Sequence, residues 1–199
     1  MVNKVLSILF IFAVAVGAAS GAAAQDKAGE VRQILEERDR EIKRVLGDKK
    51  TLTAAERERL KTVVNDGIDF EAMGRSALGD FWSKITAAQR KEFVSVFSDI
   101  VRTQSLSNLE VYRSKVTYKN IAVKGDSAYV ETSTLYKNVP TNVSYVLGLS
   151  GGKWRVEDII LDDVSTAEGY ARSFQTVIRK KGFPSLMASL QKKLEATSS

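Results

Sequence analysis

The chain has 199 residues, of which 44% are hydrophobic, with 30 lysines and arginines, 24 aspartates and glutamates, no histidine and no cysteine. This composition is typical of a globular protein. It excludes a disordered chain, a disulfide scaffold, thiol nucleophiles, and metal sites or catalytic triads built on cysteine or histidine. We therefore expect no metal ion and no cofactor. The length favours one domain.

The first 24 residues have the pattern of a cleaved secretory signal. A short basic start is followed by an uninterrupted run of apolar and small residues over Val5 to Ala19, and residues 22–24 are alanines of the kind that a signal peptidase requires. About 15 apolar residues are short for a membrane span, which needs ~20. We predict cleavage after Ala24, which leaves residues 25–199 as one exported domain. A lipid-anchored form would need a cysteine.

Basic and acidic residues are interspersed along the mature chain, so its mild positive charge indicates a solvated surface. Clustered basic residues would be expected of a nucleic-acid site, and export also argues against a nucleic-acid partner. Anionic lipid headgroups or an acidic protein surface are the alternatives to simple solubility.

Helices are expected over about residues 26–112. The first apolar stripe consists of Val31, Ile34, Leu35, Ile42, Val45 and Leu46, with residues 36–40 expected mostly outward. Capping boxes at Thr53 with Glu56 and at Thr86 with Gln89 predict two further helix starts. A short helix is expected between them, over residues 69–79. The helix that starts at Thr86 is expected to run to about Tyr112.

From residue 115 the hydrophobic period changes to two, which predicts β-strands. We expect strands over residues 115–123, 128–137, 141–149 and 153–161, separated by turns of a few residues, and therefore an antiparallel meander. Val143, Tyr145 and Leu147 fall on one face of the third strand. That apolar face has to be covered by other elements.

Helices that precede and follow the strands along the sequence are expected to cover this apolar face. A capping box at Ser165 with Glu168 predicts a helix that ends at Gly182, and Pro184 opens a last helix. Helices before and after a curled four-stranded antiparallel sheet give an α+β architecture, with the helices on one face of the sheet.

Several motifs follow one another in a distinctive order. They are Asp69-Phe70-Glu71-Ala72-Met73, Ala77-Leu78-Gly79 with Trp82, Thr86 with Gln89-Arg90 and Phe93, Val143-Ser144-Tyr145, Gly152-Lys153-Trp154-Arg155-Val156-Glu157-Asp158, Val164-Ser165, Tyr170 with Phe174, and Gly182 before Leu186 and Leu190. This order over residues 68–194 resembles the MlaC family, the periplasmic phospholipid-binding proteins of the maintenance-of-lipid-asymmetry pathway, also called toluene-tolerance proteins. The chain departs from the family at Asp162-Asp163, where a glycine usually follows the fourth strand.

The resemblance implies a fold similar to nuclear transport factor 2, wrapped by N- and C-terminal helices that enclose an apolar cavity for acyl chains. It also implies a periplasmic protein, without catalytic activity, that carries phospholipid between an outer-membrane lipoprotein complex and an inner-membrane ABC transporter complex. We expect a monomer. A carrier of another hydrophobic compound, such as a hopanoid, would show much the same sequence.

We place the walls of the expected cavity on the apolar faces of the sheet and of the helices. The expected sheet wall consists of Val130, Thr132, Val143, Tyr145, Leu147, Trp154 and Val156. The expected helical wall consists of Phe93, Phe97, Ile100, Val101, Phe174, Val177 and Ile178. Arg90, Lys153 or Arg155 would assist a headgroup at the mouth, or would simply be solvated charges. A solid core made of the same apolar side chains is the alternative to a cavity.

A small acid–base enzyme is a second hypothesis, because folds of this shape also hold a carboxylate base in an apolar pocket. Asp158 is the candidate base, since strict alternation places it on the same face as Trp154 and Val156. The spacing places no second acid, tyrosine or lysine beside it. We therefore favour a structural hydrogen-bonding role for Asp158. A ligand-free adaptor with a filled core is a third hypothesis.

Overall fold

The structure, a computed structural model, describes residues 18–49, 51–106 and 109–198. Most of the predicted leader, residues 1–17, lies outside the described residues. Helix α1 (Ala18–Leu46) begins ahead of the predicted cleavage point after Ala24. Within these ranges no helix has both the length and the apolar character needed to cross a membrane.

The helices begin and end largely where the capping signals predict. After α1 they are α2 (Ala54–Asn65), α3 (Phe70–Leu78), the 3₁₀ helix η1 (Gly79–Lys84), α4 (Ala87–Ser105), the 3₁₀ helix η2 (Leu109–Arg113), α5 (Thr166–Lys181) and α6 (Phe183–Ser198). The capping boxes at Thr53 and Thr86 are confirmed, with both reciprocal hydrogen bonds present in each. Gly79 and Gly182 end α3 and α5 at positive φ angles of 55° and 82°, which glycine adopts without steric cost.

The helix expected from Thr86 to about Tyr112 is two elements. The Tyr112 hydroxyl donates a hydrogen bond to the Ser105 carbonyl at 2.9 Å, and this carbonyl would have to accept a backbone N–H if α4 continued. The Ser105 hydroxyl donates in turn to the Arg102 carbonyl. Side-chain hydrogen bonds of this kind compete with helix propagation, so α4 ends at Ser105.

The strands form an antiparallel meander in chain order, as predicted. They are β1 (Val116–Lys124), β2 (Ser127–Tyr136), β3 (Val139–Ser150), β4 (Lys153–Leu161) and the short β5 (Val164–Ser165), which the sequence did not predict. Lys137 and Asn138, both at positive φ, form the β2–β3 turn, so β3 begins at residue 139 and not at 141. The α+β architecture is confirmed, with one more strand than expected.

The turn into β5 occurs at Asp162 and Asp163, where the chain departs from its family resemblance. Both residues adopt positive φ, at 43° and 65°. Asp162 makes two hydrogen bonds with Asn142 of β3. Its backbone N–H donates to the Asn142 carbonyl, and its carboxylate accepts from the Asn142 backbone N–H. Aspartate tolerates this conformation better than most residues, and these bonds stabilise it here without glycine.

A β-bulge in β4 changes the face on which its later residues lie. Val156 pairs with Leu147, but Asp158 pairs with the adjacent Val146, so Glu157 is an extra residue in the ladder. The residues after Glu157 therefore lie on the face opposite to the one that strict alternation predicts. Asp158 lies on the outer face, and the expectation that it shares a face with Val156 is wrong.

Asp158 joins the end of β4 to the start of α5. Its carboxylate accepts hydrogen bonds from the Ser165 hydroxyl at 2.5 Å and from the Ala167 backbone N–H at 2.9 Å. The Ser165 hydroxyl accepts from the Glu168 N–H, as predicted for the helix cap. A carboxylate at a helix N-terminus is also favoured by the helix dipole. The structural hydrogen-bonding role expected of Asp158 is therefore confirmed.

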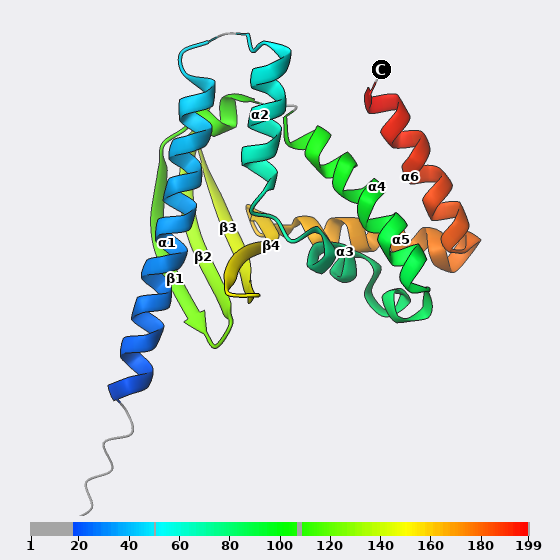
Figure 1. Ribbon diagram of the computed structural model, residues 1–199, viewed down its shortest axis with the longest axis horizontal. Helices are drawn as coiled ribbons and strands as arrows, with labels where there is room; N and C mark the ends of the chain where they lie inside the picture. The colour runs from blue at the N-terminus through cyan, green and yellow to red at the C-terminus, as the bar shows by residue number, and fades with distance from the viewer. Residues whose placement is uncertain (1–17, 50, 107–108, 199) are drawn as a thin grey trace, which may run out of the picture.

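The helices pack on the inner face of the sheet. Figure 1 shows α1 running along the strands, α2 returning beside it, and α4, α5 and α6 gathered on the other side of the molecule. The edge of β4 is also covered by the segment that leads into α3: the Val156 N–H donates to the Gly67 carbonyl, and the Asp69 N–H donates to the Val156 carbonyl. The segment that leads into α3 is thus hydrogen-bonded to the β4 edge of the sheet.

Asp158→Ala and Ser165→Ala are each expected to lower the free energy of unfolding by about 1–3 kcal/mol, because each leaves hydrogen-bonding groups of the β4–α5 junction without a partner. In the double variant the two losses are expected to fall short of their sum, since the side chains share a hydrogen bond. Urea denaturation followed by circular dichroism measures these values. Ser189→Ala, which removes only an exposed hydrogen bond within α6, is the control. Strictly additive losses would contradict the proposed coupling.

Candidate functional site

A cavity of about 480 Å³ lies between the inner face of the sheet and the helices. Its apolar lining consists of Leu35 and Ile42 from α1, Val64 from α2, Ile68, Val101 from α4, Val111 from η2, and Val116, Val143, Val156, Ile159 and Leu161 from the strands. Tyr112, Tyr118, Tyr145 and Tyr170 add aromatic rings to the wall. The volume is within the ~300–1,000 Å³ that small-molecule sites occupy.

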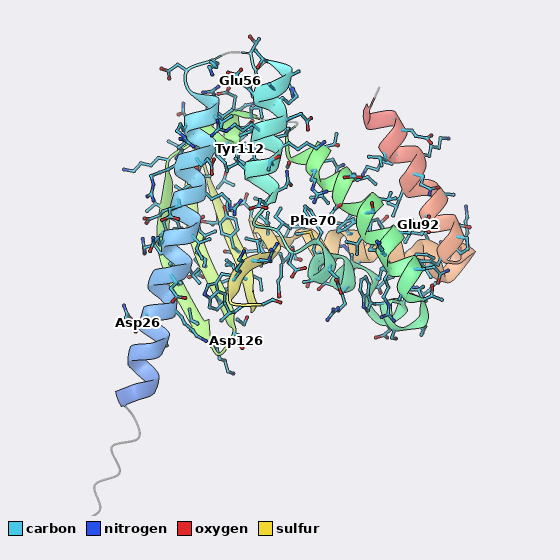
Figure 2. The ribbon with its side chains drawn as sticks, viewed as in Figure 1. Asp26, Glu56, Phe70, Glu92, Tyr112 and Asp126 are labelled. Atoms are coloured by element: carbon cyan, nitrogen blue, oxygen red, sulfur yellow. The ribbon has the colours of Figure 1, made fainter. Side chains whose placement is uncertain are left out.

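Two packed clusters border this cavity. In the main cluster Val31 of α1 packs with Val130 and Leu147 of the sheet and with side chains of α3 to α6. In the smaller one the C-terminal part of α1 packs with α2 and with Leu106, and Tyr112 contacts this cluster. Figure 2 shows Tyr112 near the end of the sheet that lies beside the α1–α2 turn, far from Asp126 at the other end. The cavity therefore occupies the space between two packed regions.

Five of the fourteen side chains predicted to line a cavity do so. They are Val101, Thr132, Val143, Tyr145 and Val156. All but one belong to the sheet, where alternation along β2 and β3 continues without interruption over the inner face. The residues of the sheet wall thus follow the period-two pattern.

The other nine predicted side chains lie outside the lining of this cavity. Val130, Leu147 and Trp154 belong to the part of the sheet covered by the N-terminal half of α1, where they are packed against side chains such as Val31. The Trp154 indole N–H faces Glu30 of α1 at 3.4 Å. This end of the inner face is solid core.

The predicted helical wall is divided in a similar way. Phe93 and Phe97 of α4 stack at 5.4 Å between ring centroids, and Phe174 of α5 meets both rings edge-on. Ile100, Val177 and Ile178 complete the predicted helical set outside the cavity lining. The apolar stripe of α4 faces α5 and α6 along most of its length. Only the last turn, from Val101, reaches the cavity.

A second, more open groove of about 470 Å³ lies between α4, α5 and α6, and Ile100, Phe174 and Val177 line it. Thr166 and Tyr170 line both this groove and the cavity. The Tyr170 hydroxyl donates to the side-chain oxygen of Gln104 at 2.9 Å. Tyr170 therefore forms part of the partition between the two spaces.

Several cavity residues depart from the strict alternation of the strands, because bulges reverse it. A bulge between Tyr118 and Asn120 in β1 and the bulge at Glu157 in β4 bring Tyr118, Ile159 and Leu161 to the inner face. A bulge leaves little signal in one sequence. Thr134, in contrast, follows Thr132 in strict alternation, and the pattern could have identified it.

Two charged residues of α1, Arg38 and Asp39, also line the cavity, although residues 36–40 were expected mostly outward. The Arg38 guanidinium donates to the Val63 carbonyl at 2.5 Å. It also lies so close to Gly67 that a Cβ there would be about 2.7 Å from it. Glycine at position 67 thus permits Arg38 to turn inward.

The basic residues predicted to assist a headgroup lie elsewhere among the described residues. Arg90 donates to the Trp82 carbonyl at 2.9 Å and covers its ring. Arg155 pairs with Gly148 on the outer face, and Lys153 lies at the start of β4, opposite Ser150. Arg38 is the cation that the structure places at the cavity instead.

The tyrosines of the cavity are shielded from water. Burial raises the pKa of Tyr145 and of Tyr112 from 10 to about 12, and burial also raises the pKa of Tyr118. These hydroxyls therefore stay neutral over the range in which exposed phenols begin to ionise. In the described part of the chain no group of three or more acidic, histidine or cysteine side chains is placed to hold a metal ion.

Two comparisons of the sequence with known proteins identify the same family. The sequence model described as MlaC protein matches residues 36–192. The intermembrane phospholipid transport system binding protein MlaC of Haemophilus influenzae is 21% identical over 150 residues, which are 66% of this chain and 67% of that protein. A phospholipid-binding protein from Ralstonia solanacearum, solved in complex with a phospholipid, has a similar structure, with a TM-score of 0.71 and 21% sequence identity. The superposition covers 86% of this chain and 98% of that chain. This last similarity shows a common fold.

The stability of the protein is expected to fall as pH rises from 10 to about 12, because the unfolded chain loses the protons of Tyr112 and Tyr145 while the folded protein keeps them. Tyr145→Phe is expected to make this fall less steep by roughly one proton. Urea denaturation at a series of pH values measures the slope, and the same measurement at neutral pH isolates packing effects. An unchanged slope in Tyr145→Phe would contradict the burial of this hydroxyl.

Proposed function

The chain belongs to the MlaC family, and from this premise we propose that it is a periplasmic phospholipid carrier that holds acyl chains in the cavity between sheet and helices. The observation that carries this proposal is the cavity itself, lined mainly by apolar side chains from α1, α2, α4, η2, β1, β3 and β4. Among the described residues no group of acidic side chains is placed to hold a metal ion.

The energetics of lipid transfer require such a cavity. A phospholipid with about 30 methylene groups in its chains would cost roughly 24 kcal/mol to expose to water, at ~0.8 kcal/mol for each methylene. A hydrophobic surface that removes a large part of these groups from water offsets this cost. The headgroup is expected to stay hydrated at the rim, where Leu161 lines the cavity and is 48% exposed.

The names of the relatives support the same proposal. The Haemophilus influenzae protein is named as the binding protein of an intermembrane phospholipid transport system, and the Ralstonia solanacearum protein was solved with a phospholipid. We extend this to the present chain as a monomer that is exported, loses its signal after Ala24, and docks in turn on an inner-membrane ABC transporter complex and an outer-membrane lipoprotein complex. Such transfer makes and breaks no covalent bond and needs no cofactor.

The structure does not place Asp158, the candidate base of the acid–base enzyme hypothesis, in the cavity. The carboxylate of Asp158 lies outside the cavity lining and accepts hydrogen bonds from Ser165 and Ala167. A different apolar cargo, such as a hopanoid, would use the same walls, and identification of the bound molecule distinguishes the two cargoes.

Native mass spectrometry of the protein purified from a bacterial periplasm is expected to show a mature chain that begins at Gln25, with phospholipid bound at close to one molecule per chain. Extraction and lipid analysis identify the cargo. A protein that is reproducibly lipid-free and also takes up no phospholipid from vesicles would refute the carrier. A hopanoid as the main extracted species would correct the cargo but keep the carrier.

Val143→Asp is expected to lower the retained phospholipid by more than about tenfold, because a carboxylate on the cavity wall would lose its hydration when acyl chains enter. Ser133→Asp is the matched control, since residue 133 lies between the cavity residues Thr132 and Thr134 and so on the outer face of β2. Lipid extraction gives the occupancy, and circular dichroism verifies the fold of both variants. Equal lipid retention in folded Val143→Asp would show that this wall does not hold the chains.

A further inference from the structure

Two threonines of β2 lie side by side in the cavity wall, with different hydrogen bonding. Thr132 is 2% exposed, and its hydroxyl donates to the Val143 carbonyl of β3 at 2.7 Å. The hydroxyl of Thr134 is buried and has no hydrogen-bond partner among the described residues. Buried hydroxyls are usually paired, because an unpaired one costs about 1–3 kcal/mol. The unpaired hydroxyl of Thr134 therefore calls for a physical explanation.

Three other polar side chains of the cavity wall are paired within the protein. Tyr112 donates to the Ser105 carbonyl, and Tyr170 donates to Gln104. Arg38 donates to the Val63 carbonyl. These side chains bond to other groups of the protein, whereas the buried Thr134 hydroxyl makes no hydrogen bond to another described residue.

The position of Thr134 separates it from the solid part of the sheet. Along the inner face of β2, Val130 is fully buried in the main cluster, Thr132 comes next, and Thr134 lies two residues farther on. The row of Thr132 continues through Val143 to Leu161, the cavity residue that is about half exposed. Thr134 thus lies toward the rim side of the wall and not above the packed core.

We propose that the Thr134 hydroxyl donates a hydrogen bond to an ester carbonyl of the bound phospholipid. This inference rests on the proposed carrier function and deepens it, because it names the part of the lipid that a side chain recognises. Ester carbonyls join the apolar chains to the polar headgroup, so they lie near the rim when the chains are inside. They accept hydrogen bonds and have no donor, which complements a hydroxyl.

A phosphate is a poorer match for this position. A phosphate group would lose its hydration at a buried hydroxyl, and one neutral donor would not compensate for that loss. A carbonyl is neutral and loses far less. The single uncharged donor therefore favours an ester over a charged headgroup.

The inference is tested with two lipids that differ only in the linkage: dipalmitoyl phosphatidylethanolamine, which has two ester carbonyls, and dihexadecyl phosphatidylethanolamine, which has ethers. The full mature chain, Thr134→Val and Thr132→Val are loaded from an equimolar mixture, and the bound lipids are extracted and quantified. The parent protein is expected to prefer the ester lipid by roughly fivefold, the range of one neutral hydrogen bond. Thr134→Val is expected to abolish that preference, and Thr132→Val to retain it.

Thermal denaturation without lipid supplies an independent readout. Thr134→Val removes an unpaired hydroxyl at nearly constant volume, so its Tm is expected to be unchanged or higher. Thr132→Val removes a made hydrogen bond, and its Tm is expected to fall by about 2–4 °C. A drop of that size in Thr134→Val would overturn the inference, because it would mean that the hydroxyl already has a partner in the protein.

The outcomes separate the two proposals. If the parent protein binds both lipids without preference, or if Thr134→Val keeps the preference for the ester, the assignment of Thr134 is overturned and the carrier function stands. If the parent protein binds neither lipid under any loading condition, the carrier function itself is refuted, and the assignment falls with it.

Discussion

The cavity depends on one constraint: the helices pack against the sheet and against each other in two separate clusters, and α1 belongs to both. Val31 anchors this helix to the sheet in the main cluster, and Ile42 and Leu46 anchor it to α2 in the smaller one. A continuous α-helix bends little between two such fixed points. The middle of α1 is therefore held away from the sheet. The side chains between the two clusters do not fill the space that results, and this space is the cavity.

Much of the fold could be predicted because its signals are local. Thr53 and Thr86 each cap a helix with their own neighbours, glycines end α3 and α5, and period-two alternation reveals the strands. The failures have tertiary causes. α4 ends at Ser105, whose carbonyl accepts a hydrogen bond from the Tyr112 hydroxyl. The residues at the end of β4 change face because Glu157 is an extra residue in the pairing with β3. Neither cause is visible in a local window of sequence.

The site could be predicted in kind but only partly in detail. The apolar pattern identifies which side chains are buried, yet burial against a core and burial against a cavity have the same sequence signature. Phe93 and Val101 share one stripe of α4, but Phe93 packs in an aromatic cluster and Val101 lines the cavity. Arg38 is the reverse case, because a charged residue points inward where Gly67 leaves space for it. Both outcomes depend on how the elements are arranged in space.

Tyr170 lies between the cavity and the α4–α5–α6 groove, so its side-chain conformation affects the size of both. Its ring meets Phe97 edge-on at 5.0 Å between centroids, its hydroxyl is tied to Gln104, and it forms part of both the cavity wall and the wall of the α4–α5–α6 groove. A rotation of this one side chain that enlarges either space takes room from the other. Such a rotation would exchange volume between the cavity and the groove, at the expense of one hydrogen bond and of the ring contacts with Phe97 and Phe174.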